Sequence, residues 1–188
     1  MALNDVGLAS RALIRIGAAP ITSFTDGSAE AEIANALFEP TNNALLSSYA
    51  WSFATAQANL TQLTSEPIAD YQYAFQLPND FLRALSAGTG SRGRGLNYRI
   101  YKNELHTNSS IVLLTYIFRP AEENFPPYFD QAVIARLAAD FTIPVTESTS
   151  RAEAMLRLAE SEFQRARQID AQQDSPNRIE SFSLTDVR

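Results

Sequence analysis

The spacing of apolar residues changes twice along this chain, and these changes limit the folds it can adopt. Residues 4–49 place apolar side chains at helical spacing, residues 54–118 show the alternation and short apolar runs typical of strands, and residues 128–172 return to helical spacing. The helices at the two ends must pack together while the strands form an insertion between them. The sequence therefore predicts an α+β protein: a four-helix bundle core with an inserted antiparallel β-sheet and hairpin region and an extended C-terminal arm.

The same pattern predicts where the parts begin and end. We expect the helical bundle to comprise residues 1–50 and 126–173, the β insertion residues 51–125, and the C-terminal arm residues 174–188. In the second half, Pro144 is expected to end a helix that starts near Tyr128. Ser150-Arg151-Ala152-Glu153 matches a capping box and predicts the start of the last helix.

Within the insertion, three stretches predict strands with particular clarity. Tyr71, Tyr73, Phe75 and Leu77 alternate with polar or small residues, and Pro78-Asn79 ends that ladder before a second short strand at residues 81–85. Residues 98–101 and 105–107 flank a turn at Lys102-Asn103-Glu104 and predict a hairpin. Residues 111–118 are largely apolar at both odd-numbered and even-numbered positions, as expected of a central strand covered on both faces.

Composition excludes several classes of function. The 188 residues suit one domain, or a core with one sizeable insertion, and the net charge of −6 leaves no surplus of Lys and Arg for wrapping nucleic acid. The absence of cysteine excludes disulfides, thiolate zinc sites and a cysteine nucleophile. No signal peptide is visible, and the longest apolar run is far too short to span a membrane, so we expect no membrane partner.

A glycine-rich stretch matches a nucleotide-binding motif only by its letters. Gly88-Thr89-Gly90-Ser91-Arg92-Gly93 fits G-x-G-x-x-G, but that site requires a helix after the glycines, and here the strand at residue 98 follows. We expect a flexible loop between two strands. Arg92 and Arg94 could still contact phosphates from this loop, although the chain as a whole is acidic.

Two other residues invite a functional interpretation. His106 is the only histidine, and a catalytic triad or zinc site would have to include it, but its position just past a turn favours a structural role. Trp51 could stack on a base or sugar, although a lone tryptophan among aromatic residues favours an anchor for the end of a helix. We predict no catalytic residue, no cofactor and no metal.

Several blocks together resemble a known family. The order and spacing of these blocks resemble those of the tail tubular protein A family. This family comprises the head-to-tail adaptors, or connectors, of short-tailed phages and related adaptors of other tailed phages and gene transfer agents. The resemblance runs from the first helix to about Gln172. The blocks are Ile16-Gly17-Ala18-Ala19-Pro20-Ile21, Trp51-Ser52-Phe53-Ala54, Phe75-Gln76-Leu77-Pro78-Asn79-Asp80-Phe81-Leu82-Arg83, Leu114-Thr115-Tyr116-Ile117, Leu137-Ala138-Ala139 and Ile143-Pro144-Val145-Thr146.

This resemblance implies a structural protein of the virion tail or neck, present in the host cytoplasm during assembly. Such adaptors form a twelve-subunit ring below the portal, extend the DNA channel and receive the next tail component, a nozzle or a stopper. The partners implied are the portal ring, that downstream component, other copies of the chain, and genomic DNA that passes through the lumen without sequence-specific binding. An acidic lumen would keep the duplex from adhering.

Two features suggest how such a protein makes its contacts. The last predicted helix carries a narrow stripe rich in small residues, from Ala152 through Ala159 to Ala166, which would let a helix of a neighbouring subunit approach closely. The arm has too few apolar residues to fold alone, and a simple disordered tail is the alternative. We expect the arm to dock on the portal or a neighbouring subunit through Ile179, Phe182, Leu184 and Val187.

Two rival functions remain open from the sequence. One is a stopper or neck protein of another layer of the same assembly. The other is a small hydrolase that acts on cell wall or nucleic acid, which would need an unrecognised polar cleft with perturbed pKa values.

Overall fold

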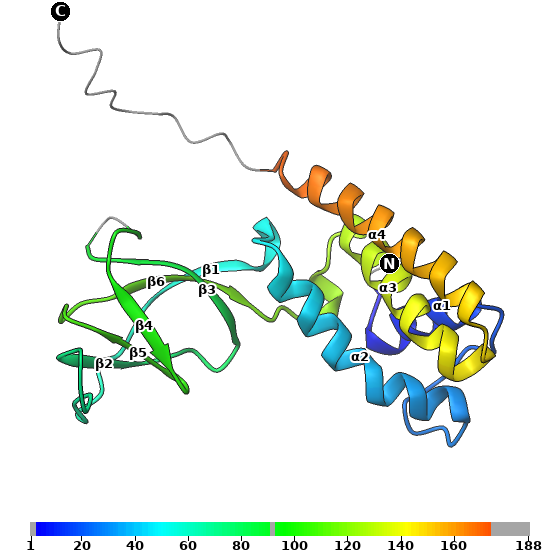
Figure 1. Ribbon diagram of the computed structural model, residues 1–188, viewed down its shortest axis with the longest axis horizontal. Coiled ribbons are helices and arrows are strands. Elements are labelled where there is room, and N and C mark those ends of the chain that lie inside the picture. The colour runs from blue at the N-terminus through cyan, green and yellow to red at the C-terminus, as the bar shows by residue number, and fades with distance from the viewer. Residues whose placement is uncertain (1–2, 91–92, 174–188) are drawn as a thin grey trace, which may run out of the picture.

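The protein consists of a helical part and a β part that lie at opposite ends of an elongated molecule (Figure 1). The computed structural model describes residues 3–90 and 93–173. The helices are α1 (Asp5–Arg15), α2 (Ala29–Ser48), α3 (Pro127–Thr146) and α4 (Thr149–Asp170), with short 3-10 helices at Ser52–Ala54 and Glu122–Asn124. The strands are β1 (Thr55–Asn59), β2 (Tyr73–Gln76), β3 (Phe81–Gly88), β4 (Tyr98–Tyr101), β5 (Glu104–Thr107) and β6 (Leu113–Phe118).

Side-chain caps mark the starts of the first two helices. The Asn4 side chain accepts a hydrogen bond from the Gly7 backbone N–H at 2.8 Å, and the Ser28 hydroxyl accepts one from Ala31 at 3.2 Å. After α1, Gly17 has a φ of +83°, the left-handed conformation that suits glycine just past a helix.

The last two helices correct two predictions. α3 does not end before Pro144 but continues to Thr146. A proline inside a helix removes one backbone hydrogen bond and crowds the carbonyl of the preceding turn, and the packing of α3 against neighbouring helices outweighs that cost. The N-cap of α4 is Ser148, whose hydroxyl accepts from Arg151 at 3.4 Å, and not Ser150. Glu147 adopts a left-handed conformation (φ 53°), so the chain reverses at once and α4 starts earlier than its capping box suggests.

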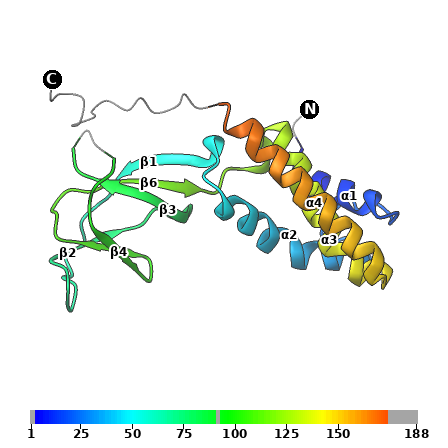
Figure 2. The same cartoon turned by 45° about the horizontal axis from the view of Figure 1, so that its top comes forward.

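α3 is the central helix of the helical part. It contacts each of the other three helices, whereas α4 packs mainly on α3 (Figure 2). Ala159 of α4 is buried with Ala135 and Ala139 of α3, because small side chains let the two backbones approach closely. The small-residue stripe of α4 is therefore used within the subunit, which corrects the expectation that it would receive a neighbouring subunit.

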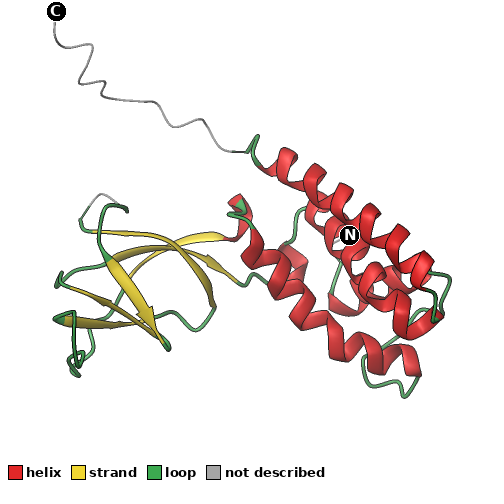
Figure 3. Ribbon diagram, in the orientation of Figure 1, coloured by secondary structure: helices red, strands yellow, loops and turns green. Residues whose placement is uncertain are grey.

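The β part contains two three-stranded antiparallel sheets, where a single inserted sheet and hairpin region was expected (Figure 3). The sheets have the orders β1-β6-β3 and β2-β5-β4, so β6 is a central strand as predicted. The predicted hairpin is confirmed: β4 pairs with β5 from Tyr98↔Thr107 to Tyr101↔Glu104. Between the sheets lies a core of Phe75, Leu77, Ala87, Leu105, Val112, Leu114 and Tyr116.

A second, larger core fills the helical part and reaches into the connections between the parts. It includes Ile117 of β6, and Leu82 and Leu85 of β3 pack against it. Trp51, Ala54 and Phe125, which the sequence placed inside the β insertion, also belong to this core. The two parts are thus joined by packed side chains as well as by the two chain crossings.

The aromatic centre of the helical core provides the first test. Phe129 is fully buried, and its ring centroid lies 4.9 Å from those of Trp51, Phe53 and Phe125. Phe129→Ala should lower the free energy of unfolding by about 3–5 kcal/mol, because it leaves a cavity that rigid neighbours cannot fill. Urea denaturation measures this loss.

The control for this test is Ile68→Ala in the β part. Ile68 is fully exposed (105 %), so its truncation should change stability by less than about 0.5 kcal/mol. A comparable loss in the two variants would contradict the assignment of Phe129 to a packed core.

Candidate functional site

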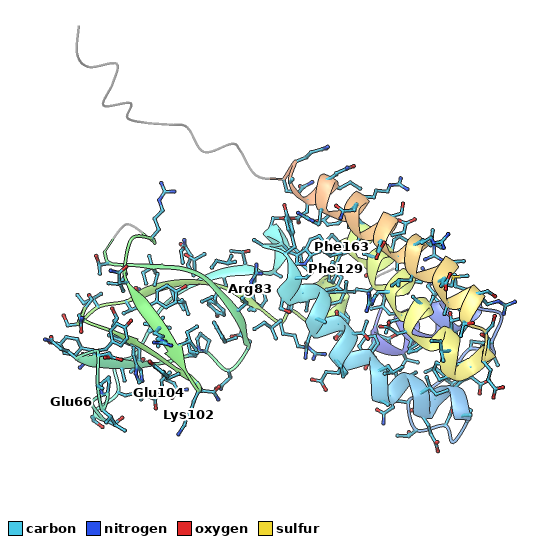
Figure 4. All side chains as sticks on the ribbon, viewed as in Figure 1. Glu66, Arg83, Lys102, Glu104, Phe129 and Phe163 are labelled. Atoms are coloured by element: carbon cyan, nitrogen blue, oxygen red, sulfur yellow. The ribbon has the colours of Figure 1, made fainter. Side chains whose placement is uncertain are left out.

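The connection between α2 and β1 is built around one buried tryptophan. Trp51 has no exposed surface, and its Nε1 donates a hydrogen bond to the Leu45 carbonyl at 3.0 Å. Its ring centroid lies 4.9 Å from that of Phe129 of α3 and 5.7 Å from that of Phe163 of α4. Figure 4 labels Phe129 and Phe163 in the helical part. Trp51 therefore anchors the end of α2, as predicted, and presents no free face on which a base or sugar could stack.

A buried carboxylate lies beside this tryptophan. Asp170, the last residue of α4, is 3 % exposed and accepts hydrogen bonds from the Ser52 backbone N–H at 3.0 Å and the Ser52 hydroxyl at 2.7 Å. The Tyr128 hydroxyl of α3 also donates to it at 2.7 Å. We call Trp51, Ser52, Tyr128 and Asp170 the joint, because these residues hold α2, α3 and α4 together where the β part begins.

The joint changes the acidity of Tyr128. Burial, together with the hydrogen bond to the Asp170 carboxylate, raises the pKa of Tyr128 to about 12. An ionised tyrosine beside a carboxylate would place two negative charges in contact. The hydroxyl therefore stays protonated and serves as a donor.

A second connection links α2 to the strand that leaves the β part. Arg119, which follows β6, lies 2.8 Å from Glu39 and 3.1 Å from Asn43 of α2. Its other terminal nitrogen lies 3.0 Å from Glu122. Because Glu39 is largely exposed, the ion pair between Arg119 and Glu39 adds little stability. The two terminal nitrogens of Arg119 nevertheless bind α2 and Glu122 at the same time, which fixes where the chain leaves the sheet.

A groove runs between α2 and α4, with α3 as its floor. Two adjoining cavities of about 430 Å³ and 570 Å³ share Arg136 and Asp140 on that floor. Asp140 accepts from the Thr41 hydroxyl at 2.9 Å and from Arg136 Nε at 3.3 Å. Apolar side chains form most of the walls of this α2–α4 groove: Leu37, Ala44, Leu45, Ile143, Leu156 and Phe163.

The glycine-rich loop lies between two strands, β3 and β4, as predicted. The Ser86 hydroxyl donates to the Gly93 carbonyl at 2.7 Å, and the Leu96 N–H donates to Ala87 at 3.0 Å, so the loop folds back onto β3. β4 follows and no helix does, which rules out the dinucleotide geometry. Arg94 is exposed on this loop, whereas Arg92 lies outside the described residues.

The predicted docking residues of the arm cannot be placed. Ile179, Phe182, Leu184 and Val187 all lie outside the described residues. The structure does define where the arm begins, because Asp170 fixes the end of α4 at the joint. Sequence reasoning did not single out Asp170, since its partner Ser52 lies 118 residues away along the chain.

In the part of the chain that the structure describes, His106 of β5 and Asp130 of α3 lie in different parts of the molecule. His106 Nε2 lies 2.9 Å from Glu104 of the same strand, with its ring beside Tyr101, so it is a hydrogen-bonded histidine near a turn, as predicted. Asp130 is half-buried, and burial raises its pKa to about 6 despite Arg11 nearby. Within residues 3–90 and 93–173, no cluster of three or more His, Asp or Glu residues could hold a metal ion.

No protein-family model matches this chain, and none of the curated proteins matches it. Among the helices that the structure describes, none has the length and apolar character needed to cross a membrane.

The joint generates a prediction about pH. Tyr128→Phe should lower the free energy of unfolding by about 1–2 kcal/mol at neutral pH, because Asp170 loses a donor. The pKa of folded Tyr128 is about 12, above the usual 10.0, so this contribution is complete below pH 10 and is lost between pH 10 and 12. The stability difference between wild type and variant should therefore shrink over that interval.

Chemical denaturation at several pH values measures this difference. Tyr101→Phe is the matched control, since Tyr101 is partly exposed on the β part. A difference between wild type and Tyr128→Phe that is constant from pH 8 to pH 12 would contradict the role given to this hydroxyl.

Proposed function

We propose that this protein is a structural head-to-tail adaptor of a tailed phage virion. Twelve copies form a ring under the portal, extend the DNA channel and dock the next tail component. The observation that carries the proposal is where the blocks of family resemblance fall in the fold. Trp51-Ser52-Phe53-Ala54 leads from the joint into β1, Leu114-Thr115-Tyr116-Ile117 lies in the central strand β6, and Leu137-Ala138-Ala139 lies in the central helix α3.

The blocks of resemblance thus lie in the segment that joins the two parts of the molecule and in the central element of each part. An adaptor must hold one surface against the portal and another against the tail in a constant relation. The joint and the Arg119 contacts supply two separate connections between the helical part and the β part. This proposal assigns the portal-side ring to the four helices, acting as a bundle, and the extension of the channel to the β part.

Contacts between subunits have to come from faces other than the small-residue stripe. Ile14 of α1 is 57 % exposed and Leu158 of α4 is 37 % exposed, and neither lines the α2–α4 groove. Apolar side chains on the outside of a helix are suited to contact with a second copy. In the ring, these faces meet those of neighbouring subunits.

Charge also favours passage of DNA without adhesion. The chain has a net charge of −6, and a ring of twelve copies would multiply that charge around its lumen. Exposed Arg94 is one of the few cations on the loop between β3 and β4 and would face DNA or the tail component.

Assembly with portal-bearing heads tests the function directly. A full-length variant with Ile179, Phe182, Leu184 and Val187 replaced by serine should fold normally but fail to join the heads, because the arm loses its apolar contacts. A matched control replaces Ser181, Ser183 and Thr185 by alanine and should join as the wild type does. Normal joining by the first variant would contradict docking through the arm.

A second test separates the adaptor from the rival hydrolase. His106→Ala should leave folding, head joining and infectivity nearly unchanged, since among the described residues the His106 side chain bonds only to Glu104 of its own strand. The matched variant is Glu104→Gln, which should have an equally small effect on folding, head joining and infectivity. A large loss of infectivity in a correctly folded His106→Ala protein would support an enzyme instead.

A further inference from the structure

The α2–α4 groove exposes large apolar side chains of α3 and α4. Ile143 of α3 is 56 % exposed and Leu156 of α4 is 40 % exposed, and both line this groove. Phe163 lines its other end, where its ring also packs against Trp51 of the joint. Apolar side chains gathered in a concave surface are typical of a docking site.

The C-terminal arm begins at a point from which it can reach the whole groove. α4 ends at Asp170, and its 22 residues span about 33 Å. Residues 174–188, if extended, span roughly 50 Å, so a chain that turns back at residue 174 can run antiparallel to α4 along its full length. The segment 174–178 alone spans roughly 16 Å, enough to bring Ile179 level with Phe163.

The arm also fits the groove in its chemistry. Its apolar residues lie at positions 179, 182, 184 and 187, and the exposed walls of the groove are largely apolar. Arg178 and Arg188 bracket that apolar segment. The groove carries Glu160 within one turn of Phe163, so an antiparallel arm with Ile179 level with Phe163 would place Arg178 near that glutamate.

We propose that, in the free subunit, residues 179–187 of the arm lie in the α2–α4 groove of the same chain. A short tether gives the attached segment an effective concentration of the order of millimolar, which favours a chain's own groove over that of another copy in dilute solution. The arm then shields the apolar walls of the groove from water. This inference concerns the free chain and does not rest on the adaptor function.

Spin labelling tests this placement directly. The chain has no cysteine, so Thr185→Cys provides a single site for a nitroxide label on the full-length protein. The label should reduce the NMR amide intensities of Ala44 and Leu45 on one wall and of Ala152 and Leu156 on the other. Amides in the β part, such as Ala58, should keep their intensity.

Charge placed in the groove should release the arm. Ala44→Glu puts a carboxylate on an exposed position of the groove wall, and it should restore the lost amide intensities. The matched control is Ala154→Glu, an exposed alanine of α4 that does not line the groove, and it should restore nothing. The same spectra report whether each variant is folded.

A mixed sample distinguishes a chain's own arm from that of another copy. Spin-labelled protein without isotope is mixed with isotope-labelled protein without spin label, and no intensity should be lost. Loss of the groove signals in this mixture would overturn docking within one chain in favour of exchange between copies. Unchanged groove signals in the directly labelled protein, or losses confined to the β part, would overturn the groove as the docking site.

Discussion

The burial of Trp51 is the contact on which the arrangement of this protein depends. Its indole occupies the space where α2 ends, α3 and α4 pass, and the chain enters the β part. Burying an aromatic ring of this size stabilises the helical core, and the hydrogen bond from its Nε1 to Leu45 keeps its polar atom satisfied. Asp170 then fixes the end of α4 to the same place through Ser52 and Tyr128. The orientation of the β part and the starting point of the arm are consequences of these contacts.

The local features of the fold could be predicted from the sequence because each depends on a few adjacent residues. Asn4 and Ser28 cap helices, Lys102-Asn103 turns a hairpin, and the apolar run that contains Leu114 and Ile117 forms a central strand. Predictions failed where distant contacts decide the outcome. α3 continues through Pro144 because it packs against three other helices, and α4 uses its alanines on α3 and not on another subunit. The carboxylate of Asp170 carries no local signal at all, because all three of its donors come from residues far from it in sequence.

Docking of the arm in the α2–α4 groove would explain how a subunit with exposed apolar side chains avoids aggregation while it is free. Apolar groups that serve a later interface are a liability in the free subunit, since they favour aggregation. An arm that fills a groove of its own chain would bury both sets of side chains at once. The groove wall includes Phe163, which packs on Trp51, and the arm starts beyond Asp170, so the joint lies at the end of the groove where the arm begins.

The central claim is that the protein is a ring-forming component of a virion neck, and imaging of purified virions tests it most directly. A reconstruction of the particle should show twelve copies of this chain in one ring immediately below the portal. Each copy should have its helical part joined to its β part through the contacts around Trp51. A ring of another stoichiometry, a position in another layer of the neck, or the absence of the chain from the particle would contradict the account.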